Sequence, residues 1–215
     1  MKKTINKIRE KLKYYPVSWI IINRLARLGI EIRPFYLIKE KLNRNLKKKF
    51  NQGFEEYSCR YLNEDEIKSI ANIKGHYISK KILLSWLKRG NKCLVLTCEE
   101  KLVAFTWFNL DKIDSIFMKR KLKPNEAYVF DAFTLESFRG KGLAPYLRYQ
   151  IYKALVNKKK NVFYSISEYF NKPAVQLKKK LNGEFLGLYI YLRIFDKWDK
   201  SFCLMKYNSN LDIKK

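Results

Sequence analysis

From residue 55 onward, the pattern of hydrophobic and polar positions predicts strands mixed with helices. Short runs rich in aromatic and β-branched residues predict strands over 57–62, 92–98, 102–110, 128–135, 161–168, 184–195 and 201–207. Apolar residues at helical spacing predict a helix that begins after Asn63 and further helices over 78–89, 143–157 and 171–181. The order β-α-α-β-β-β-α-β-α-β-β predicts an α+β fold with a mixed, mostly antiparallel central sheet flanked by helices. One parallel pair is expected, between the strands that flank the long helix.

The stretch 126–157 contains a strand, a tight turn at 138–144 and an amphipathic helix. The helix places Leu143, Leu147, Ile151 and Leu155 on one apolar stripe. Free N–H groups at a helix start, together with the positive end of the helix dipole, attract phosphate, and glycines let a ligand approach the backbone. The turn is therefore either a phosphate-binding turn or an ordinary basic surface turn, and its context must decide between them.

Residues 1–50 differ in composition, since fifteen Lys and Arg stand against three acidic residues. Helical spacing over 5–15, 19–26 and 36–46, around a short strand that starts within 28–34, predicts a basic, mainly helical extension. We therefore divide the chain into an extension at 1–50 and a domain at 51–215. The basic face suits an anionic membrane surface, but apolar residues such as Ile30, Ile32 and Phe35 favour docking on the domain.

The formal net charge of +26 indicates an acidic partner, or a protein from a lysine-rich proteome. The 35 lysines outnumber the 11 arginines, whereas nucleic-acid and phosphate sites rely on arginine for bidentate contacts. The aromatic residues mostly fall inside predicted strands, which indicates a core rather than a set of base-stacking groups. Nucleic acid is therefore the less favoured partner.

The four cysteines, Cys59, Cys93, Cys98 and Cys203, form no CxxC pair, and His76 is the only histidine, so we expect no metal site. Without a secretion signal, these cysteines indicate reduced thiols in the cytosol. The apolar run at 17–22 is too short for a signal core or a spanning helix. We expect a cytoplasmic protein, peripheral at the inner membrane face if residues 1–50 bind lipid. For His76, a satisfied or solvent-facing position is favoured over a catalytic one.

Two short motifs lie in order on the predicted elements. They are Arg139-x-x-Gly142-x-Ala144 at the start of the long helix and Asn171-Lys172-Pro173-Ala174 at the start of the next helix. Together with the element order, they resemble the GNAT acetyltransferase superfamily over about residues 55–207. The resemblance implies an N-acetyltransferase that uses acetyl-CoA as co-substrate, with no metal and with a small-molecule or peptide amine as acceptor.

The resemblance also implies a donor site. It assigns the CoA pyrophosphate to the turn and helix start, at Arg139, Gly140, Lys141, Gly142, Leu143 and Ala144. It assigns the pantetheine arm, paired like an extra strand, to the strand edge at Phe133, Thr134 and Leu135. Asn171 is a helix N-cap, a partner of a CoA amide, or both. In such enzymes a backbone N–H near a bulge in the strand polarises the thioester carbonyl, and the acceptor amine attacks it directly in a ternary complex.

Direct attack requires a group that takes a proton from the amine and a group that protonates the leaving sulfur. Asp131 is our candidate base because an acidic residue is depleted at mid-strand positions; a structural acceptor or an anchor for the amine is the alternative. The superfamily's usual acid, a Tyr, is replaced here by Lys178. Tyr169 is therefore our candidate acid, with Tyr164 or water as alternatives. The segment 182–185 departs from the superfamily's Gly-Phe ending by an insertion or shift.

The acceptor is not identified by the sequence, and neither is the oligomeric state. Aromatic residues of the last hairpin suit a sugar or a peptide, although such residues are more often core. The basic surface favours an acidic acceptor, for example a nucleotide-linked amino sugar. Two alternative functions remain open: an acyltransferase that takes its acyl group from an acidic carrier protein, and a basic nucleic-acid-binding protein.

Overall fold

The structure is a computed structural model that describes residues 17–42, 48, 50 and 52–207. The chain divides into two compact units. The terminal unit consists of Met1–Ile38, Ile166–Gln176 and Phe185–Lys215, and the central unit consists of Lys39–Ser165 and Leu177–Glu184. Each unit is described by itself below.

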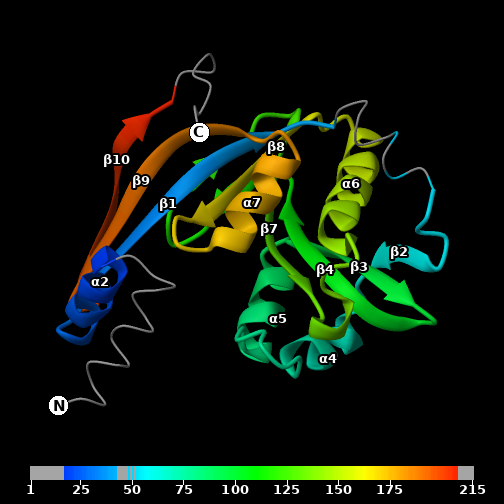
Figure 1. The fold of residues 1–215 in the computed structure, drawn as a ribbon, viewed down its shortest axis with the longest axis horizontal. Coiled ribbons are helices and arrows are strands. Elements are labelled where there is room, and N and C mark those ends of the chain that lie inside the picture. The colour runs from blue at the N-terminus through cyan, green and yellow to red at the C-terminus, as the bar shows by residue number, and fades with distance from the viewer. Residues whose placement is uncertain (1–16, 43–47, 49, 51, 208–215) are drawn as a thin grey trace. The chain divides into compact units, whose positions relative to one another are not determined.

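The central unit contains an antiparallel run of strands with helices on both faces (Figure 1). In chain order its elements are β2 (Tyr57–Tyr61), η1 (Glu64–Glu66), α4 (Ile67–Ala71), α5 (Lys80–Lys88), β3 (Lys92–Cys98), β4 (Lys101–Asn109), β5 (Lys112–Asp114), β6 (Lys119–Lys121), β7 (Glu126–Thr134) and α6 (Leu143–Val156). Its strand order is β8-β7-β4-β3-β2, where β8 spans Val162–Glu168. Strands β5 and β6 form a separate two-stranded hairpin.

The terminal unit contains α2 (Val17–Arg27) and the strand order β10-β9-β1-β8. Its strands are β1 (Ile30–Glu40), β9 (Glu184–Ile194) and β10 (Trp198–Lys206), together with the end of β8. Strands β9 and β10 form an antiparallel hairpin with one register shift between Cys203 and Met205. The helix α7 (Lys172–Lys180) begins in this unit and ends in the central unit.

The predicted fold class is confirmed. The structure is α+β, with antiparallel ladders β2–β3, β3–β4, β4–β7 and β9–β10. The parallel pair expected around the long helix is β7–β8, in the register Glu126↔Val162 to Tyr128↔Tyr164. The predicted order of elements from residue 57 onward is also present, because periodicity identifies long amphipathic helices and buried strands well.

Two details of the predicted elements are wrong. The helix expected over 36–46 is a strand as far as Glu40, where Phe35, Leu37 and Ile38 are buried in β1. Pairing with neighbouring strands outweighs the helical spacing of this segment. The charged connection at 111–125 contains the short β5–β6 hairpin, which was not predicted.

The remaining predictions for the first fifty residues have different outcomes. The helix at 19–26 is confirmed as α2. The helix at 5–15 and residues 43–46 of the later helix lie outside the described residues. The division of the chain at residue 50 stays a prediction, as does docking or membrane binding by residues 1–50.

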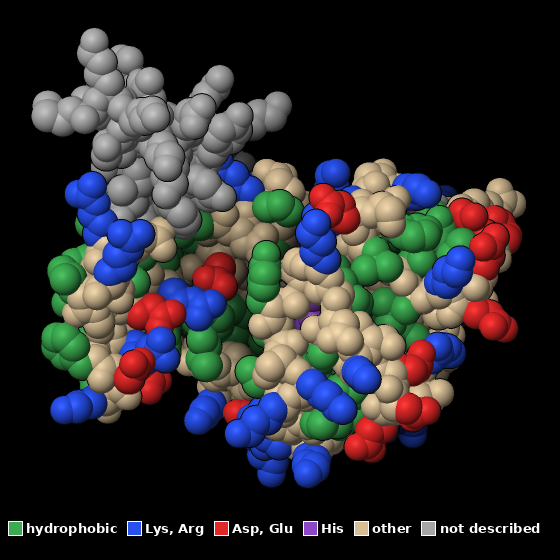
Figure 2. All heavy atoms as spheres, turned by 90° about the horizontal axis from the view of Figure 1, so that it is seen from below, with side chains coloured by type: hydrophobic (Ala, Val, Ile, Leu, Met, Phe, Trp, Pro, Cys, Tyr) green, Lys and Arg blue, Asp and Glu red, His purple; other side chains and the backbone are tan. Residues whose placement is uncertain are grey.

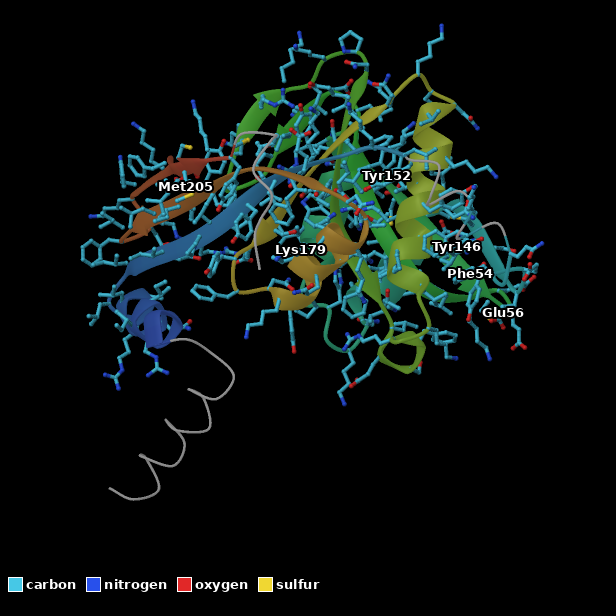
Figure 3. All side chains as sticks on the ribbon, turned by 45° about the horizontal axis from the view of Figure 1, so that its top comes forward. Phe54, Glu56, Tyr146, Tyr152, Lys179 and Met205 are labelled. Atoms are coloured by element: carbon cyan, nitrogen blue, oxygen red, sulfur yellow. The ribbon has the colours of Figure 1, made fainter. Side chains whose placement is uncertain are left out.

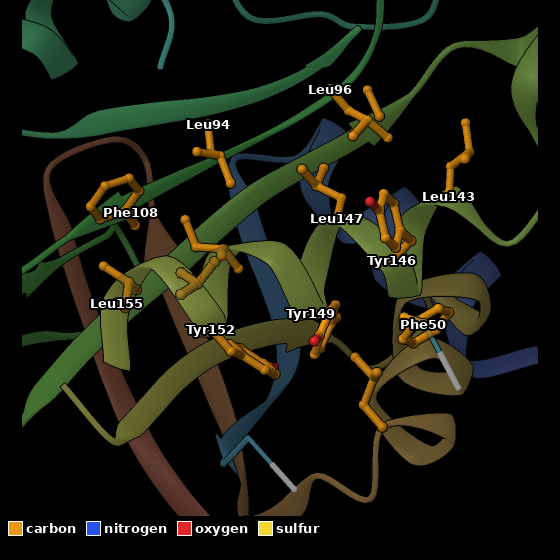
Figure 4. Close-up of a cluster of buried hydrophobic side chains, with 14 of the residues drawn as sticks. Phe50, Leu94, Leu96, Phe108, Leu143, Tyr146, Leu147, Tyr149, Tyr152 and Leu155 are labelled. Carbon is orange, nitrogen blue, oxygen red and sulfur yellow. The ribbon is translucent and has the colours of Figure 1, made fainter. Parts of the chain in front are cut away.

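Each face of the central sheet carries its own hydrophobic cluster. On the α6 face, Leu143, Leu147, Ile151 and Leu155 pack on residues such as Leu94, Leu96 and Phe108 from β3 and β4 (Figure 4). On the other face, α4 and α5 contribute Ile67, Ile70 and Leu83, which pack on Cys93, Val95, Phe105 and Trp107. Strand residues alternate between the two clusters because successive side chains of a strand point to opposite faces. The sheet is thus covered on both sides, which fixes the register of β3, β4 and β7.

A buried carboxylate joins four elements of the central unit. Glu40, at the end of β1, accepts hydrogen bonds from Tyr152 of α6, from Ser165 of β8 at 2.6 Å and from Lys178 of α7 at 3.0 Å. Arg148 of α6 adds an ion pair at 3.5 Å. All these side chains are almost completely buried, and burial, followed by the charge of Glu40, raises the pKa of Tyr152 well above its usual value. Lys178 is therefore a structural ion-pair partner.

Because of the buried ion pair, we expect Lys178 and its neighbour Lys179 on α7 to contribute differently to the free energy of unfolding. Lys178→Met removes one partner of the pair and leaves Glu40 undercompensated, so we expect a loss of about 3 kcal/mol in the free energy of unfolding. Lys179→Met, one residue further on the same helix, changes an exposed side chain (Figure 3) and should cost less than about 0.5 kcal/mol. Urea denaturation followed by circular dichroism measures both. Equal losses for the two variants would contradict the structural role of Lys178.

Candidate functional site

Strand β7 is interrupted by a β-bulge at Asp131 and Ala132. The ladder with β4 pairs Trp107 with Phe130 and Phe105 with Phe133, so two residues of β7 lie opposite Thr106. Asp131 has φ +45°, in the left-handed region that non-glycine residues rarely adopt. The hydroxyl of Thr106 donates a hydrogen bond to the carbonyl of Phe130 at 3.2 Å. The bulge breaks the ladder at the position where sequence reasoning placed the base.

Beyond the bulge, β7 offers a strand edge. The β7–β8 register ends at Tyr128↔Tyr164, and no later β7 residue pairs with the part of β8 that belongs to the central unit. The predicted pantetheine stretch, Phe133 to Leu135, lies at the end of β7. On its β4 side, Thr134 pairs with Ala104, and the N–H of Leu135 donates to the carbonyl of Val103 at 2.9 Å. An extended ligand could therefore add to the opposite edge as a further strand.

The glycine turn leads from this strand end into α6. Gly140 has φ +82° and Gly142 has φ +78°, so both positions favour glycine. Gly142 is the N-cap of α6. In the described part of the chain, no hydrogen bond is donated by the backbone N–H groups of residues 140–144. Clustered free N–H groups at a helix start form an anion-binding concavity, as the sequence predicts here.

The two basic side chains of the turn are exposed and lie over aromatic rings. The guanidinium of Arg139 is 5.6 Å from the ring centre of Phe133, and its Nε donates to the carbonyl of Thr134 at 3.2 Å. The ammonium of Lys141 is 4.9 Å from the ring centre of Phe138. Arg139 thereby connects the turn to the strand end, which brings together two parts of the predicted donor site.

Phe54 supports the start of α6, and sequence reasoning did not select it. Its ring stacks on Tyr146 with centroids 4.2 Å apart and an interplanar angle of 10° (Figure 3). A Cβ at Gly142 would lie 3.6 Å from the Phe54 ring. In the sequence, Phe54 is marked only as an aromatic residue that follows a glycine, Gly53. This pattern is too common to identify a site.

The bulge also brings Asp131 to His76, which was expected to be satisfied or solvent-facing. The Nε2 of His76 lies 3.1 Å and 3.3 Å from the two carboxylate oxygens of Asp131. The imidazole is buried and meets Phe105 and Phe133 edge-on, with ring centres 5.0 Å and 5.3 Å away. Nearby on β3, burial raises the pKa of the Cys93 thiol well above its usual value, and the charge of Asp131 adds to this. His76 is thus partnered by the candidate base itself.

Tyr169 and Asn171 belong to the terminal unit, and their roles beside the donor site stay predictions. Tyr169 is 43% exposed, and its ring contacts those of Tyr36 and Phe170. The side-chain oxygen of Asn171 accepts a hydrogen bond from the N–H of Ala174 at 3.2 Å, as an N-cap of α7 does.

Tyr164, the alternative acid, is engaged with a carboxylate. Its hydroxyl donates to Glu126 at 3.3 Å in the central unit. Burial and then the Glu126 charge raise the pKa of Tyr164, which makes it a weaker acid than an exposed phenol.

The terminal unit contains a cavity of about 560 Å³. Its lining includes two arginines, Arg33 and Arg193, and three carboxylates, Glu31, Glu168 and Asp196. These charges pair with one another, for example Arg33 with Glu168 at 2.6 Å and Arg193 with Asp196 at 3.2 Å. The cavity is polar, and its charges are mutually compensated.

Among the residues that the structure describes, no helix is both long and apolar enough to cross a membrane. No group of three or more His, Cys, Asp or Glu side chains there is arranged to hold a metal ion.

Comparison with known proteins gives similarity at the level of structure. No family model and no curated protein matches this chain. A GCN5-related N-acetyltransferase-like protein from Streptococcus suis superposes with a TM-score of 0.53 at 15% identity, over 84% of this chain and 68% of that protein. A tandem GNAT protein from the clavulanic acid biosynthesis pathway gives 0.54 at 10% identity, over 87% and 57%. A functionally unknown conserved protein from Staphylococcus epidermidis gives 0.57 at 9% identity, over 81% and 67%.

The matched region spans only part of these structures, between 57% and 68% of their lengths. A Drosophila protein that superposes with a TM-score of 0.54 is covered over 56% of its length. Identities of 9–15% carry the fold and not the activity. Proteins named as GNAT acetyltransferases recur among these structural neighbours, and the order of strands and helices agrees with the resemblance seen in the sequence motifs. The chain therefore has the GNAT acetyltransferase fold.

Proposed function

We propose that this protein is an N-acetyltransferase that moves an acetyl group from acetyl-CoA to an amine of an unidentified acceptor, by direct attack in a ternary complex. The observation that carries the proposal is the continuous arrangement on β7 and α6. A bulge with a carboxylate is followed by an open strand edge and then by a glycine turn with free N–H groups. The fold and the two sequence motifs support the same proposal.

The turn would hold the pyrophosphate of the donor. The N–H groups of residues 140–144 have no acceptor among the described residues, and phosphate oxygens are the acceptors that such a helix start favours. Arg139 and Lys141 supply two positive charges at the same place. Pro145 carries no N–H, so the donors come from the turn and from Leu143 and Ala144 rather than from the full first turn of α6.

The strand end would hold the acetylated arm. An amide-bearing extended chain can pair with the free edge at Phe133, Thr134 and Leu135. A bulge leaves a backbone N–H outside the ladder, and such a group can donate to the thioester oxygen as negative charge develops there. Asp131 lies in that bulge and is the proposed acceptor of the amine proton. Tyr169 remains our proposed proton donor to the leaving sulfur.

The phosphate site can be tested by removing charge from the turn. In Arg139→Ala/Lys141→Ala, we expect calorimetry to show CoA binding weakened about tenfold or more, because two charges beside the phosphates are lost. Pantetheine, which has no pyrophosphate, should bind the variant and the wild type equally.

The matched control is Lys153→Ala/Lys158→Ala, which removes one positive charge from the last turn of α6 and one just beyond that helix. This control should leave CoA affinity within about twofold at moderate salt, since charges far beyond a Debye length of about 8–10 Å are screened. If the wild type fails to bind CoA at millimolar concentration, the proposed function is wrong. If the protein takes acetyl groups only from an acyl carrier protein, acetyl-CoA is not its donor and that part of the proposal is wrong.

Asp131→Asn tests the proton acceptor. With acetyl-CoA and a panel of primary amines (ethanolamine, glucosamine, spermidine and a lysine peptide), we expect amine-dependent CoA release to fall about a hundredfold. The affinity for acetyl-CoA should change little, because Asp131 lies before the donor stretch. CoA release is best followed by chromatography, since the exposed Cys59 and Cys203 would react with thiol reagents. Asp111→Asn changes an exposed carboxylate outside the site and should behave like the wild type; full activity of Asp131→Asn would exclude Asp131.

A further inference from the structure

Asp131 adopts a backbone conformation that an L-residue rarely uses. Its φ of +45° lies in the left-handed region, which is sterically unfavourable for a non-glycine residue. The neighbouring ladder must stabilise this conformation, and it does so on both sides of the bulge, at Trp107↔Phe130 and Phe105↔Phe133. Unfavourable backbone conformations that the surrounding structure enforces cluster at functional sites, where they position a side chain. Here it brings the carboxylate to His76.

The imidazole of His76 is held so that only one of its nitrogens has a partner. Nε2 faces the Asp131 carboxylate, whereas Nδ1 is buried with no hydrogen-bond partner among the described residues. A carboxylate only accepts hydrogen bonds, so the proton is assigned to Nε2, which donates it to Asp131. A second proton on Nδ1 would be buried without an acceptor. The geometry thus favours a neutral imidazole that acts as a hydrogen-bond donor.

The two members of the pair differ in exposure. The His76 side chain is 4% exposed and the Asp131 side chain 20%. The carboxylate is therefore the outward member, and the imidazole lies behind it, edge-on to the stacked rings of Phe105 and Phe133. Phe133 is also the first residue of the proposed pantetheine stretch. The pair thus borders the end of β7 where the thioester is proposed to bind.

The charges around the pair leave the carboxylate available for a cation. Cys93 on β3 and Tyr128 on β7 are the titratable groups that interact with Asp131, and burial raises the pKa of each, so both stay neutral. Among the described residues, no Lys or Arg forms an ion pair with Asp131, and His76 is its hydrogen-bond partner. Lys and Arg side chains are spread over the face of the molecule seen in Figure 2, yet none of those described pairs with the Asp131 carboxylate.

We propose that His76 is a positioning residue for the acetyl transfer, which keeps the Asp131 carboxylate turned toward the acceptor amine. The inference rests on the proposed function and adds a residue that the sequence motifs do not include. The outward carboxylate binds a primary amine as its ammonium ion and takes one proton from it. The neutral nitrogen forms the new C–N bond, the C–S bond breaks, and its electron pair leaves with sulfur. As the amide forms, the nitrogen gives up a second proton and the sulfur gains one, while the Asp131 carboxyl returns its proton to water. The products are an amide, free CoA thiol and one released proton.

Two substitutions separate the hydrogen bond of His76 from its packing. His76→Phe keeps an aromatic ring against Phe105 and Phe133 but removes the donor. His76→Gln keeps an N–H donor on a side chain of similar reach. We expect His76→Phe to lower amine-dependent CoA release about tenfold to a hundredfold, because the carboxylate loses its orientation. His76→Gln should recover at least half of the loss that His76→Phe causes in the logarithm of the rate of CoA release. The affinity for acetyl-CoA should stay within about threefold in both variants.

The pair also has a direct spectroscopic signature. His76 is the only histidine, so ¹⁵N-histidine labelling of the full chain gives one pair of ring-nitrogen signals. We expect the signals of a neutral ring protonated on Nε2, a change of these signals in Asp131→Asn, and a further shift when acetyl-CoA is added. A ring protonated on Nδ1, or signals that Asp131→Asn leaves unchanged, would overturn the hydrogen bond.

The outcomes distinguish this inference from the function on which it rests. If calorimetry detects acetyl-CoA binding and amines stimulate CoA release, but His76→Phe is as active as the wild type, the role of His76 is wrong and the proposed function stands. Equal losses in His76→Phe and His76→Gln, with melting temperatures like that of the wild type, also overturn the role as a donor. If acetyl-CoA does not bind, the proposed function fails, and the role of His76 in acetyl transfer fails with it.

Discussion

The packing of four elements in the central unit depends on compensating the charge of one buried carboxylate. Glu40 is almost inaccessible to water, and an isolated charge there would cost several kcal/mol. The charge is tolerated because Lys178, Arg148, Tyr152 and Ser165 converge on it from three other elements. The ends of β1 and α7 are thereby fixed against α6 and β8. The same helix α6 begins at the glycine turn, so the proposed phosphate site stands on an element that is anchored at its middle.

Strand β7 contributes side chains to the hydrophobic clusters on both faces of the central sheet, and it also carries the proposed proton acceptor. Its regular first half contributes Ala127 and Val129 to the core under α6. Its second half changes register at the bulge, where Phe130 and Phe133 pack on the α4–α5 side. The bulge turns Asp131 toward His76, and the strand end leads into the turn with Arg139. The bulge thus places the proposed proton acceptor just before the residues proposed to bind acetyl-CoA, while β7 stays paired with β4 on both sides.

Fold and site are specified to different degrees in this chain. The GNAT fold is recognisable in structures that share 9–15% of its sequence, because strand order and two-sided burial tolerate many apolar residues. The chemistry is less tolerant, because it depends on single side chains. At the position where the superfamily usually has a Tyr acid, this chain has Lys178, which is used to balance Glu40. In the proposed reaction, sulfur must therefore receive its proton from a group other than residue 178, and the acceptor amine has still to be identified.

The sequence by itself determined most of the elements from residue 57 onward and the glycine turn at the start of α6. These features are local, since periodicity, β-branched and aromatic runs and glycine spacing are read within a few residues. The order of the elements then predicted the mixed sheet and the parallel β7–β8 pair. Only the tertiary structure decided that residues 36–40 belong to a strand, since the pairing partners of β1 are distant in the chain. It also decided the partners of Asp131 and Lys178, which lie 55 and 138 residues away. Such pairs leave no spacing pattern in the sequence, because burial and hydrogen-bond geometry bring them together only when the sheet and its helices have packed.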